Sequence, residues 1–302
     1  MAIKSDAKIR KECYFCNMIK LSTTVKSDPL PVKISLSDTI MIVGSCFADS
    51  VGQRLAQSGF NVCINPFGTL YNPVSIANSL ARLSHPRPFS EEECVEMGAG
   101  AGLICSWWHH TSFARSSCKE FLEVANASLQ RASEFWKESK KVIVTLGTAM
   151  VWRRVSDGEI VSNCLKRPSR EFSHEILSVG YVAAILKNVI TSYPDKEFIF
   201  TVSPIRHLGE GAHNNSISKA TLLLALDSAL QGTDACYYPS YEILLDELRD
   251  YRYYTEDLVH PSKTAVDIIY ERFLDAVTVV EERKKIERNE KESRFLSHRE
   301  MH

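Results

Sequence analysis

The sequence lacks the features that most directly assign a protein to a membrane or to nucleic acid. No apolar run approaches the roughly 18 residues that a membrane-spanning helix requires. The N-terminal segment is basic but has no apolar core of the kind found in a signal peptide. The formal net charge is −1, so no excess of positive charge favours nucleic acid or an anionic membrane as a partner. We therefore expect a cytoplasmic protein with no nucleic-acid and no membrane partner.

Motifs for cofactors and metals are missing as well. The chain contains no P-loop, no G-x-G-x-x-G fingerprint and no H-E-x-x-H. Cys13 and Cys16 form a C-x-x-C, but a zinc site takes about four ligands and no second such pair follows. The nine cysteines are odd in number and spread through apolar segments, so we interpret them as reduced thiols. We expect no cofactor and no metal.

What the chain does contain is an alternation of apolar runs and helical patterns. Of its 302 residues 44% are hydrophobic, enough to bury a sizeable core. Strands are predicted at Thr39–Val43, Asn61–Asn65, Lys141–Leu146, Glu197–Val202 and Ala235–Ile243. Helices are predicted at Ala48–Ser58, Val74–Leu83, Cys118–Lys137, Ser173–Ser192 and Ser218–Leu230. This alternation predicts an α/β fold whose parallel sheet is covered by helices on both faces.

The ends of the chain differ in composition from the middle. Residues 1–32 are polar and end in a proline-containing stretch, which favours an extended arm. Residues 279–302 are rich in charge and poor in apolar residues, which indicates a solvated helix or tail. We expect a single α/β domain over residues 33–278 between these two extensions.

The first predicted strand ends in Gly44-Ser45-Cys46, where a helix begins. Unpaired backbone N–H groups and the positive end of the helix dipole stabilise a thiolate or an oxyanion at such a position. A glycine before it allows a sharp turn and a close approach of substrate. Cys46 and Ser45 are therefore both candidate nucleophiles, with a lowered thiol pKa expected for Cys46. The structural alternative is that Ser45 caps the helix and Cys46 is a small buried residue.

A candidate base for such a nucleophile occurs late in the chain. Asp257 and His260 form a D-x-x-H pair just before a predicted helix with Pro261 near its first turn. At this spacing the carboxylate can accept the Nδ1 proton of the histidine and leave Nε2 free to carry a proton.

Two further clusters carry polar side chains. The stretch "SWWHHTSFARS" places His110 beside two tryptophans, which suits either stacking on a sugar or a capping loop held by its aromatic rings. Arg206 and His207 follow the fourth predicted strand, where an arginine can bind a carboxylate or phosphate or simply pair with an aspartate of the chain.

Together these stretches resemble the GSCFA family, whose name is the motif that stands here at residues 44–48. The resemblance covers about Lys33 to Phe273. It also includes "NPFGTLYNPVSI", "TLGTAMVWR", "VSNCLKRP", "TVSPIRH", "SKATLL", "YYPSYEILLDELRDYRYY" and "DLVHPSKTAVDIIYERF". The family in turn resembles the SGNH (GDSL-type) hydrolases. That resemblance implies a three-layer α/β/α flavodoxin-like fold and hydrolysis or transfer of acyl groups on esters, often acetyl groups on carbohydrates.

Compared with the SGNH pattern, the D-x-x-H block is intact, whereas the first and third blocks differ. The first SGNH block is Gly-Asp-Ser, so without a gap Cys46 takes the nucleophile position, and with a one-residue shift Ser45 does. The second block implies that Gly68 donates its N–H to an oxyanion. The third block, Gly-x-Asn-Asp, reads "GTAM" here and lacks its asparagine, so that Thr148 or Asn163 would have to substitute. Loss of one such donor costs about 10²- to 10³-fold in rate.

The resulting expectation is an acyl hydrolase or acyltransferase acting through a covalent acyl-enzyme on a small-molecule or glycan ester. His260 would be the general base and then the general acid, oriented by Asp257. Two alternatives stay open: a non-catalytic module that binds glycan or peptide, and a phosphate-recognising transferase that uses Arg206 and His207.

Overall fold

The computed structural model describes residues 22–300, so the Cys13 and Cys16 pair lies outside the described part of the chain. Its centre is a parallel five-stranded sheet in the order β10-β9-β5-β1-β2. The strands are β1 (Thr39–Gly44), β2 (Asn61–Ile64), β5 (Lys141–Leu146), β9 (Glu197–Val202) and β10 (Cys236–Tyr237). Counted along the chain, the order is 2-1-3-4-5, which is the flavodoxin-like doubly wound order.

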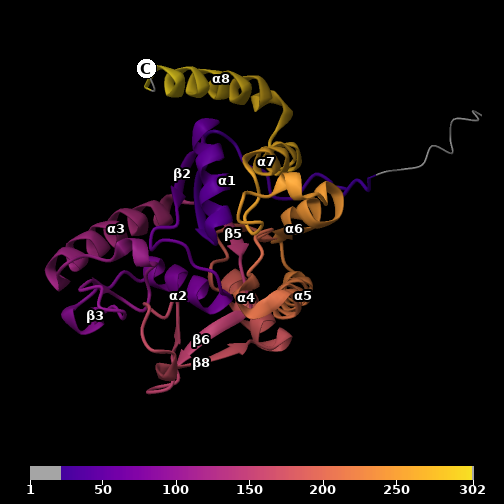
Figure 1. The fold of residues 1–302 in the computed structure, drawn as a ribbon. Coiled ribbons are helices and arrows are strands. Elements are labelled where there is room, and N and C mark those ends of the chain that lie inside the picture. Colours follow the sequence, from indigo (N-terminus) through magenta and orange to yellow (C-terminus); the bar gives the residue numbers. More distant parts are fainter. Residues whose placement is uncertain (1–21, 301–302) are drawn as a thin grey trace, which may run out of the picture.

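Helices cover both faces of this sheet (Figure 1). One layer is α2 (Pro73–Ser84), α3 (Cys118–Glu138), α4 (Val179–Ser192) and α5 (Gly211–Leu230). The other contains α1 (Cys46–Gln57), α6 (Ser240–Glu242) and α7 (Lys263–Val277). Successive side chains of β1 enter opposite cores, because Met41 and Val43 pack under the first layer and Ile40 and Ile42 under the second. The expected three-layer α/β/α fold is confirmed.

Side-chain caps explain where several of these helices begin. The side-chain oxygens of five N-cap residues each accept a backbone N–H of the first turn. These residues are Ser45, Asn72, Ser117, Ser178 and Ser262. The predicted helix bounds are confirmed to within a few residues for α1, α2 and α3.

The prediction of a helix from Ser173 was wrong. Residues Phe172–Ile176 form strand β8, which pairs with β6 (Met150–Arg154), and α4 starts only at Val179. The physical reason is the alternating burial of Phe172–Ile176, which suits an antiparallel pair better than a helix. Strand β7 (Ile160–Val161) completes this small sheet, which the sequence analysis did not predict.

The remaining elements are short. They are the strand pair β3 (Val95–Glu96) and β4 (Ile104–Cys105), a π-helix at Ile243–Leu248 that follows α6, and several one-turn 3-10 helices. The fifth predicted strand is accordingly shorter than expected, because its second half forms α6.

Both chain extensions pack on the α/β core where the structure describes them. The N–H of Leu30 donates to Ala276 O of α7 at 2.9 Å. The C-terminal charged segment forms α8 (Arg283–Glu300), which buries Ile286 and reaches Ser58 through Glu290 Oε1 at 2.6 Å (Figure 1). The tail is therefore a helix docked beside α1 rather than free chain.

The interpretation of the cysteines as reduced thiols needs one correction. Cys94 and Cys118 form a disulfide, with Cα atoms 5.8 Å apart, within the usual bridging range. Cys46, Cys63, Cys105, Cys164 and Cys236 are free. Disulfides are more typical of oxidising compartments, so a cytoplasmic location stays a prediction.

This disulfide gives a direct test. Digestion of the unreduced, alkylated protein should yield the Cys94 and Cys118 peptides as one linked species, measured by mass spectrometry. Reduction before alkylation should release them separately. Finding both peptides alkylated without reductant would contradict the bridge.

Residues 22–300 were searched for membrane-spanning helices and for metal-binding groups, and neither is found there. Each helix there is too short or too polar to cross a bilayer. Within the same range no group of three or more His, Cys, Asp or Glu side chains is arranged to hold a metal ion.

Candidate functional site

The candidate site lies where the strand order of the sheet reverses. Strand β1 pairs with β2 on one side and with β5 on the other, so β1 and β5 are the strands at the switch point. In doubly wound sheets ligands bind at the carboxyl ends of the strands beside this point. Those ends carry Gly44-Ser45-Cys46 after β1 and Gly147-Thr148 after β5.

Gly44 is required at the end of β1 by the closeness of the neighbouring strand. Its φ is +138°, and a Cβ built on it would lie 2.1 Å from the backbone oxygen of Thr145. The glycine allows the close approach of the β5 backbone, and the close approach of a substrate stays a prediction.

Ser45 is fully buried and acts as the N-cap of α1. Its Oγ accepts the N–H of Phe47 at 3.3 Å and lies 3.2 Å from the Thr145 hydroxyl. Its own N–H donates to Thr145 O at 3.0 Å. Ser45 is therefore held by hydrogen bonds to α1 and to β5.

Cys46, the first residue of α1, is partly exposed and carries a free thiol. Burial raises the pKa of this thiol, whereas its own backbone N–H and the nearby Lys219 lower it in part. The expected net lowering of the pKa was wrong, because loss of hydration around the sulfur outweighs the helix terminus. The resting thiol is consequently protonated at neutral pH and needs a proton acceptor before it can act as a nucleophile.

Asn65 braces this turn from the end of β2. Its side-chain oxygen accepts the N–H of Gly44 at 2.8 Å, and its amide donates to Asp49 Oδ1 at 2.7 Å. Burial raises the pKa of Asp49. The negative charge of Asp49 in turn raises the pKa of Cys46. The sequence analysis assigned neither residue a role, although Asn65 begins the quoted stretch "NPFGTLYNPVSI".

Lys219 of α5 is almost completely buried beneath the same strand ends. Its Nζ donates to Gly147 O at 2.6 Å and to Ser203 O at 2.8 Å, the backbone just after β5 and β9. Burial lowers the pKa of Lys219 to about 7, and the interaction with Cys46 opposes that shift. Sequence analysis quoted "SKATLL" as a family stretch but assigned this lysine no role.

Tyr71 and His207 connect this centre to an open pocket. The Tyr71 side chain is within hydrogen-bonding reach of the Cys46 thiol, and its ring packs edge-on against His207 with centroids 5.5 Å apart. Burial, and then the charges of Lys219 and His260, lower the pKa of His207 to about 4. His207 is thus neutral near pH 7, and its buried Nε2 has no hydrogen-bond partner.

Asp257 and His260 form the predicted pair. Asp257 Oδ2 lies 2.6 Å from His260 Nδ1, and Asp257 Oδ1 accepts the N–H groups of Val259 and His260 and the Thr255 hydroxyl. The His260 backbone N–H, the Thr255 hydroxyl and the other donors hold the pKa of Asp257 well below its usual range. An ionised Asp257 fixes the proton on Nδ1 and leaves Nε2 free.

The structure brings His260 to the site through intermediates rather than by direct contact with Cys46. The charges of Lys219 and His260 both lower the pKa of His207, and the charge of Lys219 lowers that of Cys46 in part. Within the described chain no hydrogen bond joins the side chains of His260 and Cys46, although catalytic hydrogen bonds are often long in the absence of substrate.

The expected oxyanion donors all have partners of their own. The N–H of Gly68 donates to Asn65 O at 2.8 Å, so an oxyanion there would compete with that carbonyl. The Thr148 hydroxyl is 2.8 Å from Ser218 Oγ, and the Asn163 amide donates to His109 O. Thr148 and Asn163 nevertheless line the open pocket.

That pocket has a volume of about 310 Å³ and contains Trp152 and His174, stacked with ring centroids 4.0 Å apart. Its other lining side chains include Tyr71, Thr148, Asn163, Cys164, His207 and Glu210. The aromatic wall of the site pocket thus comes from β6 and β8, which sequence analysis did not connect with function.

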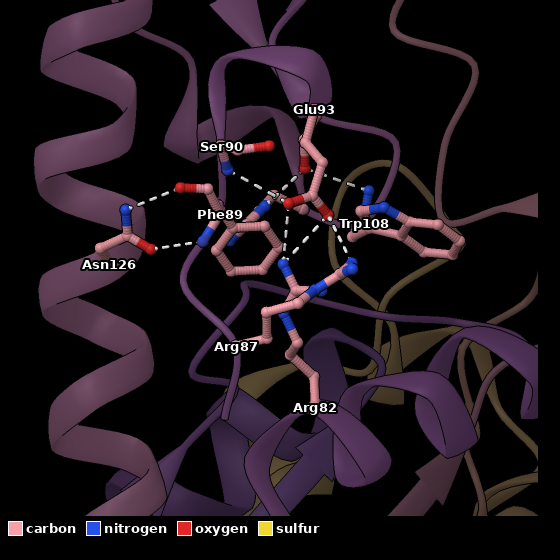
Figure 2. A network of polar contacts seen from close by, with 9 residues as sticks. Arg82, Arg87, Phe89, Ser90, Glu93, Trp108 and Asn126 are labelled. Atoms are coloured by element: carbon pink, nitrogen blue, oxygen red, sulfur yellow. Dashed lines mark hydrogen bonds and ion pairs between the residues drawn. The ribbon is translucent and has the colours of Figure 1, made fainter. Parts of the chain in front are cut away.

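The loop of Trp107 to His110 instead borders a second pocket, of about 450 Å³, lined by Trp108, Phe67 and Phe89. Figure 2 shows how this wall is held: Arg82 bonds both carboxylate oxygens of Glu93 and lies 4.0 Å over the Phe89 ring. His109 of the loop packs against four phenylalanine rings, which favours the interpretation of the loop as one held by aromatic contacts.

His110 of this loop lies beside Gly68. A Cβ on Gly68 would lie 2.4 Å from His110 Cβ, and burial lowers the pKa of His110, which the charge of Asp49 opposes. Arg206 is half-buried beside Tyr241 and Tyr254, and its Nε has no hydrogen-bond partner.

Comparison with known families places most of the chain in one family. A family model described as "GSCFA family" matches residues 39–273, from the start of β1 to the last turns of α7. The chain belongs to the GSCFA family. The matched range includes both the Gly44-Ser45-Cys46 turn and the D-x-x-H loop of this GSCFA protein. A search of curated proteins finds no match.

Proposed function

We propose that this GSCFA protein is an acyl hydrolase or acyltransferase that forms a thioester on Cys46. The observation that carries the proposal is the contrast between the two candidate nucleophiles. Ser45 is fully buried as a helix cap, whereas the Cys46 thiol is partly exposed at the switch point beside Lys219 and Tyr71. An intact, oriented Asp257–His260 pair supports catalysis over binding alone, because a binding module needs no oriented histidine.

The proposed reaction has two halves. The sulfur of Cys46 attacks the acyl carbon of an ester, a C–S bond forms, and the C–O bond breaks to release an alcohol. Water or another acceptor then attacks the thioester and returns the thiol. His260 carries protons from the attacking group to the leaving group in each half, and Asp257 holds its ring in the required tautomer.

The pocket next to Cys46 supports a carbohydrate or other small-metabolite ester as substrate. Its stacked Trp152 and His174 form a flat wall, and amide, hydroxyl and carboxylate groups lie around it. Flat aromatic surfaces with nearby polar groups suit sugars and similar polar rings. The SGNH resemblance adds support by analogy of sequence alone.

The proposal can be tested by intact-protein mass after exposure to p-nitrophenyl acetate. Wild type should gain one acetyl group, which Cys46→Ala should remove. Ser45→Ala should keep the adduct while losing about 1 kcal/mol of stability, because only a helix cap is lost. Cys164→Ala is the matched control, since Cys164 is another partly exposed free thiol and lines the pocket that Tyr71 borders.

Substitution of His260 separates proton transfer from simple thiol labelling. His260→Gln should slow turnover by about 10²- to 10⁴-fold. An adduct that survives Cys46→Ala would contradict the assignment of the nucleophile. Absence of an adduct on wild type would favour the glycan- or peptide-binding alternative, and an activity lost only in His207→Ala would favour the phosphate-recognising transferase.

A further inference from the structure

We infer that the cavity of about 450 Å³ beside α2 is a second ligand site, which takes a small molecule with a flat apolar ring and a carboxylate. The proposed reaction makes no use of this α2 cavity. Its volume is within the range of small-molecule sites. Aromatic rings in its lining suit the ring of such a ligand, and arginine side chains suit the carboxylate.

The α2 cavity is a neighbour of the site pocket but is separate from it. The two hollows have no lining residue in common. Asn72 of the site pocket donates its amide to Ser75 Oγ of the α2 cavity at 3.0 Å. On another side, the Ser162 hydroxyl of the site pocket donates to the backbone oxygen of Trp108 at 3.4 Å, and Trp108 lines the α2 cavity. A ligand can therefore occupy the α2 cavity while a substrate occupies the site pocket.

The aromatic wall of the α2 cavity is fixed in place before any ligand binds. The rings of Phe67 and Phe89 meet edge to face with centroids 5.9 Å apart. The backbone of Phe89 is held on both sides, because its N–H donates to Asn126 Oδ1 at 2.7 Å and its oxygen accepts the Asn126 amide at 3.1 Å (Figure 2). A wall that is already ordered reduces the entropy cost of binding, and its flat faces suit an apolar ring.

Arg82 is oriented in this wall with part of its hydrogen-bonding capacity unused. Its guanidinium lies 4.0 Å over the Phe89 ring, and Nη2 donates to both carboxylate oxygens of Glu93 at 2.9 and 3.0 Å (Figure 2). The buried Nε has no hydrogen-bond partner within residues 22–300. Because a guanidinium has five N–H groups, Arg82 can bind Glu93 and still donate to a carboxylate in the cavity.

The other polar groups of the lining also favour an anion. Arg87 is exposed on the same side, 3.9 Å from Glu93. Ser79 is almost completely buried, and its hydroxyl has no hydrogen-bond partner in the part of the chain that the structure describes. Glu93 is not among the lining residues, and the acidic side chain that is among them, Glu159, is exposed. Two lining arginines against one hydrated carboxylate leave the cavity attractive to negative charge.

Binding of 2-naphthoate to the wild-type protein, measured by isothermal titration calorimetry, tests the inference. A Kd of about 1 mM or tighter is expected for a ligand of this size in a cavity that fits it. The uncharged analogue 2-naphthylmethanol has the same ring and should bind at least about tenfold more weakly, because it leaves the arginines without an anion. Equal affinity for the two compounds, or no saturable binding of 2-naphthoate, would overturn the inference.

A blocking substitution locates the bound probe. Asn78 is an exposed residue of α2 that lines the cavity, so Asn78→Trp should fill the cavity without disturbing the core and should abolish binding. Asn188→Trp is the matched control, because Asn188 is an exposed residue of α4 outside the cavity lining. Binding of 2-naphthoate that survives Asn78→Trp would place the probe elsewhere and contradict the inference.

Charge substitutions at the rim test the preference for an anion. Arg87→Gln should weaken the binding of 2-naphthoate about two- to fivefold, and Glu159→Gln should strengthen it by a similar factor. Shifts in the opposite directions would indicate a site for cations and overturn the assignment. Both residues are exposed, and neither belongs to the proposed catalytic machinery, so acetyl labelling of Cys46 should stay unchanged in both variants.

Discussion

Replacing Gly44 with alanine is expected to remove much of the stability of the protein and to abolish labelling of Cys46. The new Cβ would lie 2.1 Å from Thr145 O and 2.6 Å from its Oγ1, at a φ of +138° that L side chains rarely adopt. The nearer of these atoms belongs to the backbone of central strand β5, which cannot move without disrupting the sheet. We expect a loss of about 3 kcal/mol or more in the free energy of unfolding.

Urea unfolding followed by circular dichroism checks the stability, and acetyl labelling checks the site. Gly180→Ala is the matched control, because a Cβ there meets nothing within 4 Å and the residue is helical. Its stability should be unchanged or up to about 1 kcal/mol higher. A Gly44→Ala protein as stable and as reactive as wild type would show that the strand ends can separate at little cost.

Acidification is expected to destabilise the protein through His109. This side chain is fully buried among aromatic rings, and its Nε2 has no hydrogen-bond partner. The rings are those of Phe67, Phe89, Phe113 and Phe121. Burial, with a smaller contribution from Arg82, lowers the pKa of His109 to about 3. In the unfolded chain the pKa of a histidine is about 6.5.

Between these two pH values the unfolded chain binds a proton that the folded protein does not. Stability therefore falls as pH decreases through this window, and from pH 7 to pH 4.5 His109 alone should cost about 2.5 kcal/mol. His207, whose pKa is about 4, acts in the same direction.

Urea unfolding at pH 7 and pH 4.5 measures this loss. His109→Asn keeps a polar atom near Ser106, the partner of His109 Nδ1 at 2.7 Å, but removes the proton site. The variant should lose about 2.5 kcal/mol less than wild type between the two pH values. His213→Gln, at an exposed position, is the control and should follow wild type. Equal pH dependence in wild type and His109→Asn would contradict the prediction.

The sheet could be predicted from sequence because its strands are buried on both faces. The runs "TIMIV", "KVIVTL" and "EFIFTV" have no polar alternation, and each became a central strand. The segment Phe172–Ile176 could not be assigned in the same way. Its strand character depends on pairing with Met150–Arg154, some 20 residues earlier in the chain.

The site was predictable only in its local parts. The capped turn at Ser45 and the Asp257–His260 pair each depend on residues a few positions apart, so spacing alone was sufficient to propose them. Lys219 and Tyr71 are far from Cys46 in sequence, and only the fold places them at the same strand ends, where both contact Gly147.

Apolar runs and local spacings were enough to predict the three-layer architecture, the edge of the sheet where polar residues gather, and the pairing of Asp257 with His260. The packing of distant segments set which of the two candidate nucleophiles is accessible, the direction of the Cys46 pKa shift, and the burial of Lys219. The physical reason is that helix termini and i, i+3 contacts act over one turn. Desolvation and the electrostatic environment of a thiol depend on every element packed around it.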